Sequence, residues 1–216
     1  MKKKIIMVSA LICGVLIISG TVVYGQRHNK ELIEWGKDMA DVTAEYTDAP
    51  EETDVKAGVI SQCELEVATS FYLQMGYDEE EALEAAKEYL IKREAIYMEA
   101  VSNGYSATDE EVWEYLDTLK ETISSADNSE DIISVIEQFD SEEDFWNYEF
   151  IVYKKDLPAQ NYISDMEDSY DNNALRTKSS VTDSASDAKS AESWETYFET
   201  LKDGLEEKYE DEIVFE

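Results

Sequence analysis

The chain has 216 residues and a formal net charge of −33, with 51 acidic against 18 basic side chains, a size that suits one domain with additional segments. So acidic a chain offers no basic face for phosphate groups, which excludes nucleic-acid binding. One histidine and two cysteines exclude a histidine-based catalytic triad, a structural zinc site and a disulfide framework, while 43% hydrophobic residues suffice for a folded core.

The N-terminal segment, residues 1–26, predicts export from the cytoplasm. Three lysines precede an uncharged, mostly apolar run of 20 residues from Ile5 to Tyr24. As a helix this run spans roughly 30 Å, the thickness of a bilayer core. Two fates stay open: residues 5–24 anchor the protein in the cell membrane, or they are cleaved as a signal peptide and the protein is secreted. Both place the rest of the chain outside the cytoplasm.

The exported part is more acidic than the whole chain. Residues 1–26 hold three lysines and no acid, so the remainder has 15 basic against 51 acidic side chains and a net charge of −36. Such a surface favours basic segments of unfolded chains and loosely held cations. A solvated acidic coat that keeps the protein soluble is the simpler interpretation.

Residues 27–54 are predicted to form an amphipathic helix followed by an acidic linker, because apolar residues recur at helical spacing before a proline-containing break. Val55–Ile60 is predicted to be a short strand. Ser61 and Glu64 form a capping box, which starts a helix at once. Gly76 marks the end of that helix.

Further capping signals start the next helices. Asp78 opens a long helix of about 25 residues, and Thr108 with Glu111 opens the one that follows. Apolar spacing predicts more helix between residues 132 and 170, with at most one break at Pro158.

The two strand-like segments predict how the ends of the domain meet. Val55–Ile60 and Ile213–Phe215 are isolated in an otherwise helical sequence, so we expect them to pair with each other. Residues 191–216, a helix and a strand, would then return to the helical domain of residues 55–170 across a flexible Ser/Asp-rich linker at residues 171–190. The predicted fold is mostly α, with one short two-stranded pairing and an N-terminal membrane segment.

The residues that carry a family resemblance lie in the centre of the chain. Ala85–Ala100 and the turn Gly104–Val112 resemble the SurA N-terminal chaperone domain, which also occurs in PrsA-type lipoproteins. In that family a short strand and a capped helix come first, as in Val55–Leu65. The resemblance covers residues 55–170, and it extends to residues 191–216 because the family's C-terminal helix and strand also return to the N-terminal part.

One departure from the family limits the expected activity. Its members carry a parvulin-type prolyl isomerase domain between the two halves, and here only the linker of residues 171–190 takes that place. His28 is the sole histidine. The chain is therefore predicted not to be an enzyme and to need no cofactor or metal, and a hydrolase using acids alone is disfavoured because so many acids single out no pair. What the resemblance implies is a helical module that binds polypeptides through apolar surface.

Five apolar residues are candidates for contact with a bound polypeptide. Ile91, Ala95 and Met98 lie opposite the main apolar stripe of the long helix, which therefore has two apolar faces. Either this helix is packed on both sides, the simpler interpretation, or its second face is an open substrate groove. Trp113 and Trp146 pose the same choice between core packing and peptide contact.

The predicted function is a chaperone-like protein, tethered or secreted, that holds unfolded or newly exported polypeptides without catalysis. The alternative is an adaptor, a helical module that binds one dedicated partner in a membrane or secretion complex. A chaperone would bind many unfolded sequences weakly, whereas an adaptor would bind one partner and ignore the rest.

Overall fold

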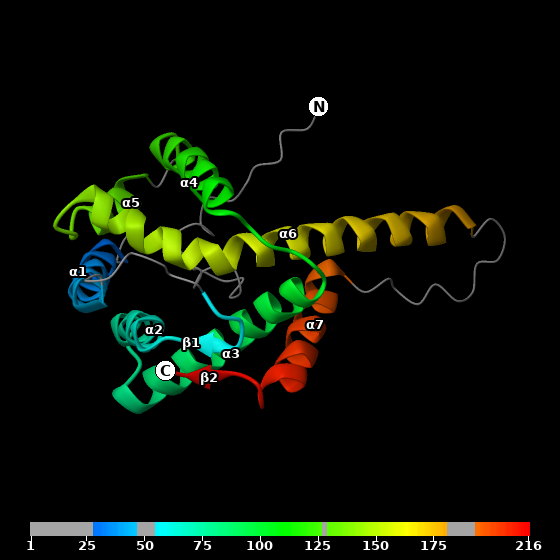
Figure 1. The fold of residues 1–216 in the computed structure, drawn as a ribbon, viewed down its shortest axis with the longest axis horizontal. Coiled ribbons are helices and arrows are strands. Elements are labelled where there is room, and N and C mark those ends of the chain that lie inside the picture. The colour runs from blue at the N-terminus through cyan, green and yellow to red at the C-terminus, as the bar shows by residue number, and fades with distance from the viewer. Residues whose placement is uncertain (1–27, 47–54, 127–128, 181–192) are drawn as a thin grey trace.

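The computed structural model describes residues 28–46, 55–126, 129–180 and 193–216, which are mostly helical (Figure 1). The predicted membrane segment, residues 5–24, lies outside these ranges. Among the helices that the structure describes, none combines the length and the apolar character needed to cross a bilayer. In chain order the elements are α1 (His28–Tyr46), β1 (Val59–Ile60), α2 (Gln62–Gln74), α3 (Glu79–Ser102), α4 (Asp109–Ser124), α5 (Ser129–Ile136), α6 (Glu142–Ser180), α7 (Trp194–Tyr209) and β2 (Val214–Phe215).

Three helices begin where their capping residues predict. The Ser61 hydroxyl accepts a hydrogen bond from the backbone N–H of Glu64, and the Glu64 carboxylate accepts one from the backbone N–H of Ser61, which completes the box at α2. Thr108 and Glu111 form the same reciprocal pair at α4. At α3 the Asp78 carboxylate accepts from two N–H groups of the first turn. Each cap gives partners to N–H groups that a helix start leaves open, a gain of about 1 kcal/mol.

The predicted pairing of the two strands is confirmed. β1 and β2 are parallel, with Val59 opposite Val214 and Ile60 opposite Phe215. β1 is shorter than the predicted strand Val55–Ile60, because Gly58 has a φ of +84° and turns the chain just before it.

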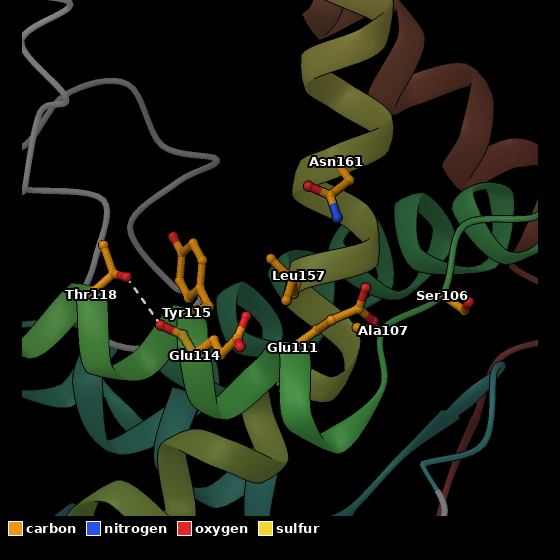
Figure 2. A pocket seen from close by; sticks show the side chains of 8 residues that line it. All are labelled: Ser106, Ala107, Glu111, Glu114, Tyr115, Thr118, Leu157 and Asn161. Carbon is orange, nitrogen blue, oxygen red and sulfur yellow. Dashed lines mark hydrogen bonds between the residues drawn. The ribbon is translucent and has the colours of Figure 1, made fainter.

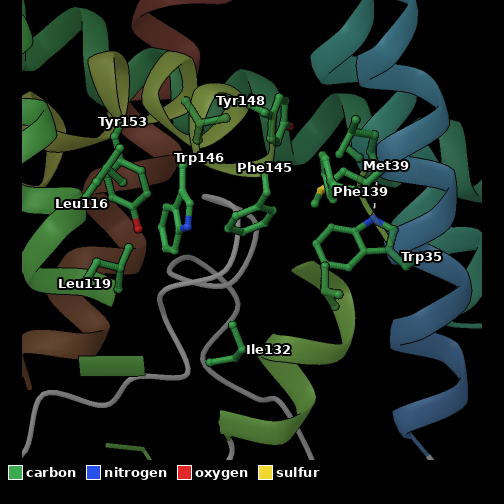
Figure 3. Close-up of a cluster of buried hydrophobic side chains, with 14 of the residues drawn as sticks. Trp35, Met39, Leu116, Leu119, Ile132, Phe139, Phe145, Trp146, Tyr148 and Tyr153 are labelled. Carbon is green, nitrogen blue, oxygen red and sulfur yellow. Dashed lines mark hydrogen bonds between the residues drawn. The ribbon is translucent and has the colours of Figure 1, made fainter. Parts of the chain in front are cut away.

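The buried side chains form two clusters that meet along α3 and α6. The larger cluster contains side chains from each of the helices α1 through α6, and aromatic residues such as Trp35 and Phe145 lie within it (Figure 3). The smaller cluster lies between α7, α3 and α6; its buried members are Ala95, Ile96, Ala100, Ala159, Tyr162, Leu205 and Tyr209. Through this second cluster the C-terminal segment packs against the helical domain, as the strand pairing predicts.

Helix α6 extends further than the sequence indicates. It continues through Pro158 and reaches Ser180, so the prediction of a flexible linker is wrong for residues 171–180, which are helical. Residues 181–192, the remainder of that segment, lie outside the described residues.

Packing explains why Pro158 does not end the helix. A proline inside a helix removes one hydrogen bond and costs about 3 kcal/mol. Leu157, Pro158 and Ala159 are all buried, and Leu157 belongs to the larger cluster while Ala159 belongs to the smaller one. Further along α6, the ring of Tyr170 lies 5.1 Å from that of Tyr197 in α7. Contacts on both sides of the proline therefore hold the helix together.

Candidate functional site

Three of the five predicted contact residues are packed against other elements. Ala95 is fully buried in the smaller cluster, and Ile91 and Met98 are half-buried, packed against the larger and the smaller cluster respectively. The terminal methyl group of Met98 also lies against the Gly58 backbone, 3.5 Å from where a Cβ of that residue would stand. α3 is thus packed on both sides, the simpler of the two interpretations. A polypeptide could contact this face only if α7 and the sheet moved away from α3.

Trp113 and Trp146, in contrast, line one hollow between α4 and α6. Trp113 is 36% exposed and stacks on Phe150 of α6, with 4.6 Å between the ring centres, so one face of its ring is covered. Trp146 is only 5% exposed, and its ring lies among the side chains of the larger cluster (Figure 3). The hollow has a volume of about 480 Å³, and its lining is completed by Lys120, Glu142, Glu143 and Asn147.

Polar side chains contact both tryptophan rings of this hollow, called the tryptophan hollow below. The Lys120 ammonium lies 4.8 Å from the ring centre of Trp146 and 6.0 Å from that of Trp113, within range of cation–π attraction to both. The indole N–H of Trp146 donates a hydrogen bond of 2.9 Å to the Glu142 carboxylate. Aromatic surface beside a cation and carboxylates is suited to holding an apolar side chain while meeting the polar backbone of a peptide.

A second hollow lies on the other flank of α4 and was not predicted from the sequence (Figure 2). Its volume is about 320 Å³. The Tyr115 hydroxyl at its edge donates a 3.0 Å hydrogen bond to the Gln160 side chain of α6. Its lining comes from α4, the turn before it and α6: Ser106, Ala107, Glu111, Glu114, Tyr115, Thr118, Leu157 and Asn161. α4 therefore packs on α6 along a buried stripe, with one hollow on each side of it.

A buried ionic network lies beneath β1, formed by Glu64 of α2, Arg93 and Glu94 of α3, and Lys155 and Asp156 of α6. The Arg93 guanidinium donates to the Asp156 carboxylate at 2.7 Å and to Glu64 at 2.9 Å. Arg93 and Asp156 are both less than a tenth exposed. One cation therefore ties three helices together.

The other cation of the network holds the strand. The Lys155 ammonium lies 3.0 Å from the Glu94 carboxylate and donates a 2.6 Å hydrogen bond to the backbone carbonyl of Val59 in β1. Glu94 in turn accepts the backbone N–H of Gly58 at 2.8 Å. The backbone leading into β1 is therefore clamped by one donor and one acceptor from the helices below it.

Burial shifts the pKa values of the network's carboxyl groups. Desolvation raises the pKa of Glu94 and of Asp156, because it outweighs the attraction of Lys155 and Arg93. Desolvation also works to raise the pKa of Glu64, but the nearby cations and the hydrogen bonds from Ser61 outweigh it, so that pKa is lowered.

Perturbed carboxyl groups are candidates for acid or base catalysis when they face a cleft. Here they face paired cations beneath β1, and neither of the two hollows is lined by any of them. The ionic network therefore acts as a structural clamp. The sequence held one signal for it, since Arg93 occupies the apolar stripe of α3, where Ala86 and Ala100 stand two turns away on either side.

The remaining polar chemistry of the described residues is limited. Cys63 is a free thiol and half-buried. Within the described ranges, no group of three or more His, Cys, Asp or Glu side chains is placed to share a metal ion.

Comparisons of the chain with known proteins found no match among protein-family models, curated proteins or solved structures.

Proposed function

We propose that this protein is a chaperone-like protein that binds unfolded or newly exported polypeptides outside the cytoplasm, without catalysing a reaction on them. The observation that carries the proposal is the tryptophan hollow between α4 and α6. Trp113 and Trp146 are 33 positions apart, and the packing of α4 on α6 brings them to one surface hollow of about 480 Å³, within the size range of small-ligand sites.

The chemistry of the hollow fits weak binding of many sequences. A flat aromatic ring accepts apolar side chains of different shape, because stacking and dispersion require no fixed partner geometry. Lys120 and the carboxylates at the rim can exchange hydrogen bonds with any peptide backbone. The acidic surface of the chain adds attraction for basic segments and keeps the complex soluble.

The resemblance to the SurA N-terminal domain supports the same proposal. In that family the C-terminal helix and strand return to the N-terminal part, and here β2 pairs with β1 while α7 packs on α3. Family membership and a position outside the cytoplasm, with residues 5–24 as anchor or signal, are parts of this proposal.

A second candidate is an adaptor for one dedicated partner, and one surface favours it. Leu73, Met75 and Tyr77 are each more than a third exposed and lie at the end of α2 and in the turn that leads to α3. The ring of Tyr77 lies 5.5 Å from that of Tyr72, in an edge-to-face contact. A compact apolar surface of this kind suits a single partner better than many.

The two candidates can be separated by an aggregation assay. The full chain, held in lipid nanodiscs, is added to two unrelated unfolded clients, with empty nanodiscs as the blank. Trp113→Ala removes the exposed wall of the hollow, and Tyr77→Ala removes an aromatic ring of similar exposure from the α2–α3 turn. We expect the wild type and Tyr77→Ala to suppress aggregation of both clients, and Trp113→Ala to lose most of that effect.

Two results would contradict this. If the wild type protects neither client, general chaperone activity is wrong, and the adaptor surface at the α2–α3 turn becomes the leading candidate. If both variants protect as well as the wild type, polypeptides bind elsewhere than in the tryptophan hollow. Circular dichroism of each variant establishes that the helices are intact.

A further inference from the structure

In the part of the chain that the structure describes, the outer edge of β2 has backbone groups without a strand beside it. In the parallel ladder, Val214 donates its N–H to the carbonyl of Gly58, and Glu216 donates its N–H to that of Ile60. The carbonyl of Glu216 accepts from Gln62. Because backbone groups alternate in direction along a strand, the N–H and C=O of Phe215 point to the opposite side.

No other strand of the described sheet lies on that opposite side. The described sheet contains two strands, in the order β1 then β2, so β2 is its edge, and Figure 1 shows β2 on the side away from α6. Val214 is 45% and Phe215 is 38% exposed. An exposed edge of this kind is a template on which another extended chain can pair.

The charges around the edge define which chain fits. Residues 210–216 hold four acids, Glu210, Asp211, Glu212 and Glu216, and no base, and all four are exposed. A second copy of this chain would bring the same acidic segment to the edge, so like charges oppose that pairing. A basic strand would be attracted.

We infer that the edge of β2 binds an extended, basic polypeptide segment by strand addition, with the backbone of Phe215 exchanging hydrogen bonds with the segment. The inference rests on the proposed function for its class of partner, since unfolded and newly exported chains present extended backbone. It adds a second contact to that function, one that selects for charge and backbone instead of apolar side chains.

A peptide-binding experiment tests the inference directly. The probe is a fluorescent four-residue peptide of alternating valine and lysine, and its matched control is the same peptide N-methylated at every residue, which keeps the side chains and removes the N–H donors. Binding to the full chain in nanodiscs is followed by fluorescence anisotropy. We expect methylation to weaken binding about tenfold, the effect of losing one or two hydrogen bonds.

Variants at Phe215 test the same hydrogen bonds by removing a backbone donor from the protein instead of from the peptide. Phe215→Pro and Phe215→Ala both remove the ring, but only proline removes the outward N–H, while the N–H groups of Val214 and Glu216 that hold the ladder remain. We expect Phe215→Pro to bind the unmethylated peptide about tenfold more weakly than Phe215→Ala. If Phe215→Pro fails to fold, the two peptides on the wild-type chain decide the question alone.

Equal binding of the two peptides to the wild-type chain would overturn the inference, because charge alone would then hold them. Equal binding of a peptide in which glutamate replaces lysine would overturn the choice of a basic partner. Neither result touches the proposed function, since the aggregation assay reports on Trp113 and Tyr77 and uses no variant of β2. Conversely, loss of aggregation suppression in Trp113→Ala leaves the peptide result at Phe215 unchanged.

Discussion

Replacing Lys155 with methionine tests how strongly the buried ionic network holds β1. Lys155 is 4% exposed, and its ammonium contacts Glu94 at 3.0 Å and the Val59 carbonyl at 2.6 Å. Methionine keeps the length of the side chain but removes the charge and the donors. Glu94, 2% exposed, then loses its nearest cation. Removing one partner of a buried ion pair costs about 3–5 kcal/mol, because the other charge stays buried and uncompensated.

A second substitution separates the charge effect from lost packing. Glu94→Gln removes the carboxylate charge and keeps an oxygen that can accept the Gly58 N–H. Because Lys155 still has the Glu64 carboxylate at 3.5 Å and the Val59 carbonyl at 2.6 Å, this variant alone should cost only about 1–3 kcal/mol. In the double variant Lys155→Met with Glu94→Gln no unpaired carboxylate remains at that position. The double variant should therefore be more stable than the sum of the single effects, by about 1–3 kcal/mol.

Urea unfolding, followed by circular dichroism and tryptophan fluorescence, measures these free energies. The matched control is Lys154→Met at the neighbouring position, where the ammonium pairs with a largely exposed Asp109 at 3.0 Å, and its cost should stay below about 1 kcal/mol. Equal costs for Lys154→Met and Lys155→Met, or strict additivity in the double variant, would refute the account of the network as a buried clamp.

Three further predictions follow from single residues. Burial raises the pKa of the Cys63 thiol from an ordinary 9.0 to about 12. In a chain with Cys13→Ser, alkylation of Cys63 near neutral pH should therefore be about a thousandfold slower in the folded protein than after unfolding, and equal rates would contradict this. Gly58 and Gly76 both have positive φ, but only at Gly58 would a Cβ meet a backbone carbonyl, at 3.1 Å, so Gly58→Ala should lower the midpoint of urea unfolding more than Gly76→Ala, and the reverse order would count against the structure. The pKa of Glu64 is lowered in the folded state, so its contribution to stability is present above the ordinary value of 4.5 and is lost as the pH falls through the folded-state pKa. In Glu64→Gln the free energy of unfolding should therefore fall less steeply with decreasing pH below 4.5 than in the wild type. An equal fall in the two proteins would contradict this role of Glu64.

Local signals predicted the helix starts because the interacting atoms are local. Ser61 and Glu64 are three residues apart, as are Thr108 and Glu111, so the capping pattern contains both partners of each bond. The strand pairing was predicted on a different basis, namely that a helical chain with two isolated strand-like segments offers each strand one partner. That argument gives the partner, but it does not give the bounds, which depend on the turn at Gly58.

The network and the end of α6 depend on information that no short window of sequence holds. Arg93 bonds to partners 29 and 63 positions away, so its place on an apolar stripe is visible from sequence but its partners are not. Residues 171–180 have the composition of a linker, but they continue a helix that is already anchored by Tyr170 against α7. Extending an existing helix needs far less favourable sequence than nucleating one.

For the candidate site too, the sequence of one helix predicts its apolar face, but it does not predict which other elements cover that face. The spacing of Ile91, Ala95 and Met98 correctly marks an apolar face of α3, but an apolar face is a groove only if nothing covers it. The smaller cluster covers Ala95 and Met98 with Leu205 and Tyr209 of α7, about a hundred positions further along the chain, and Ile91 packs against the larger cluster. Because α7 is covalently joined to β2 and β2 is paired with β1, the clamp at β1 and the cover over α3 belong to one arrangement. The two surfaces that we propose for polypeptides, the flank of α4 and the edge of β2, lie outside this arrangement.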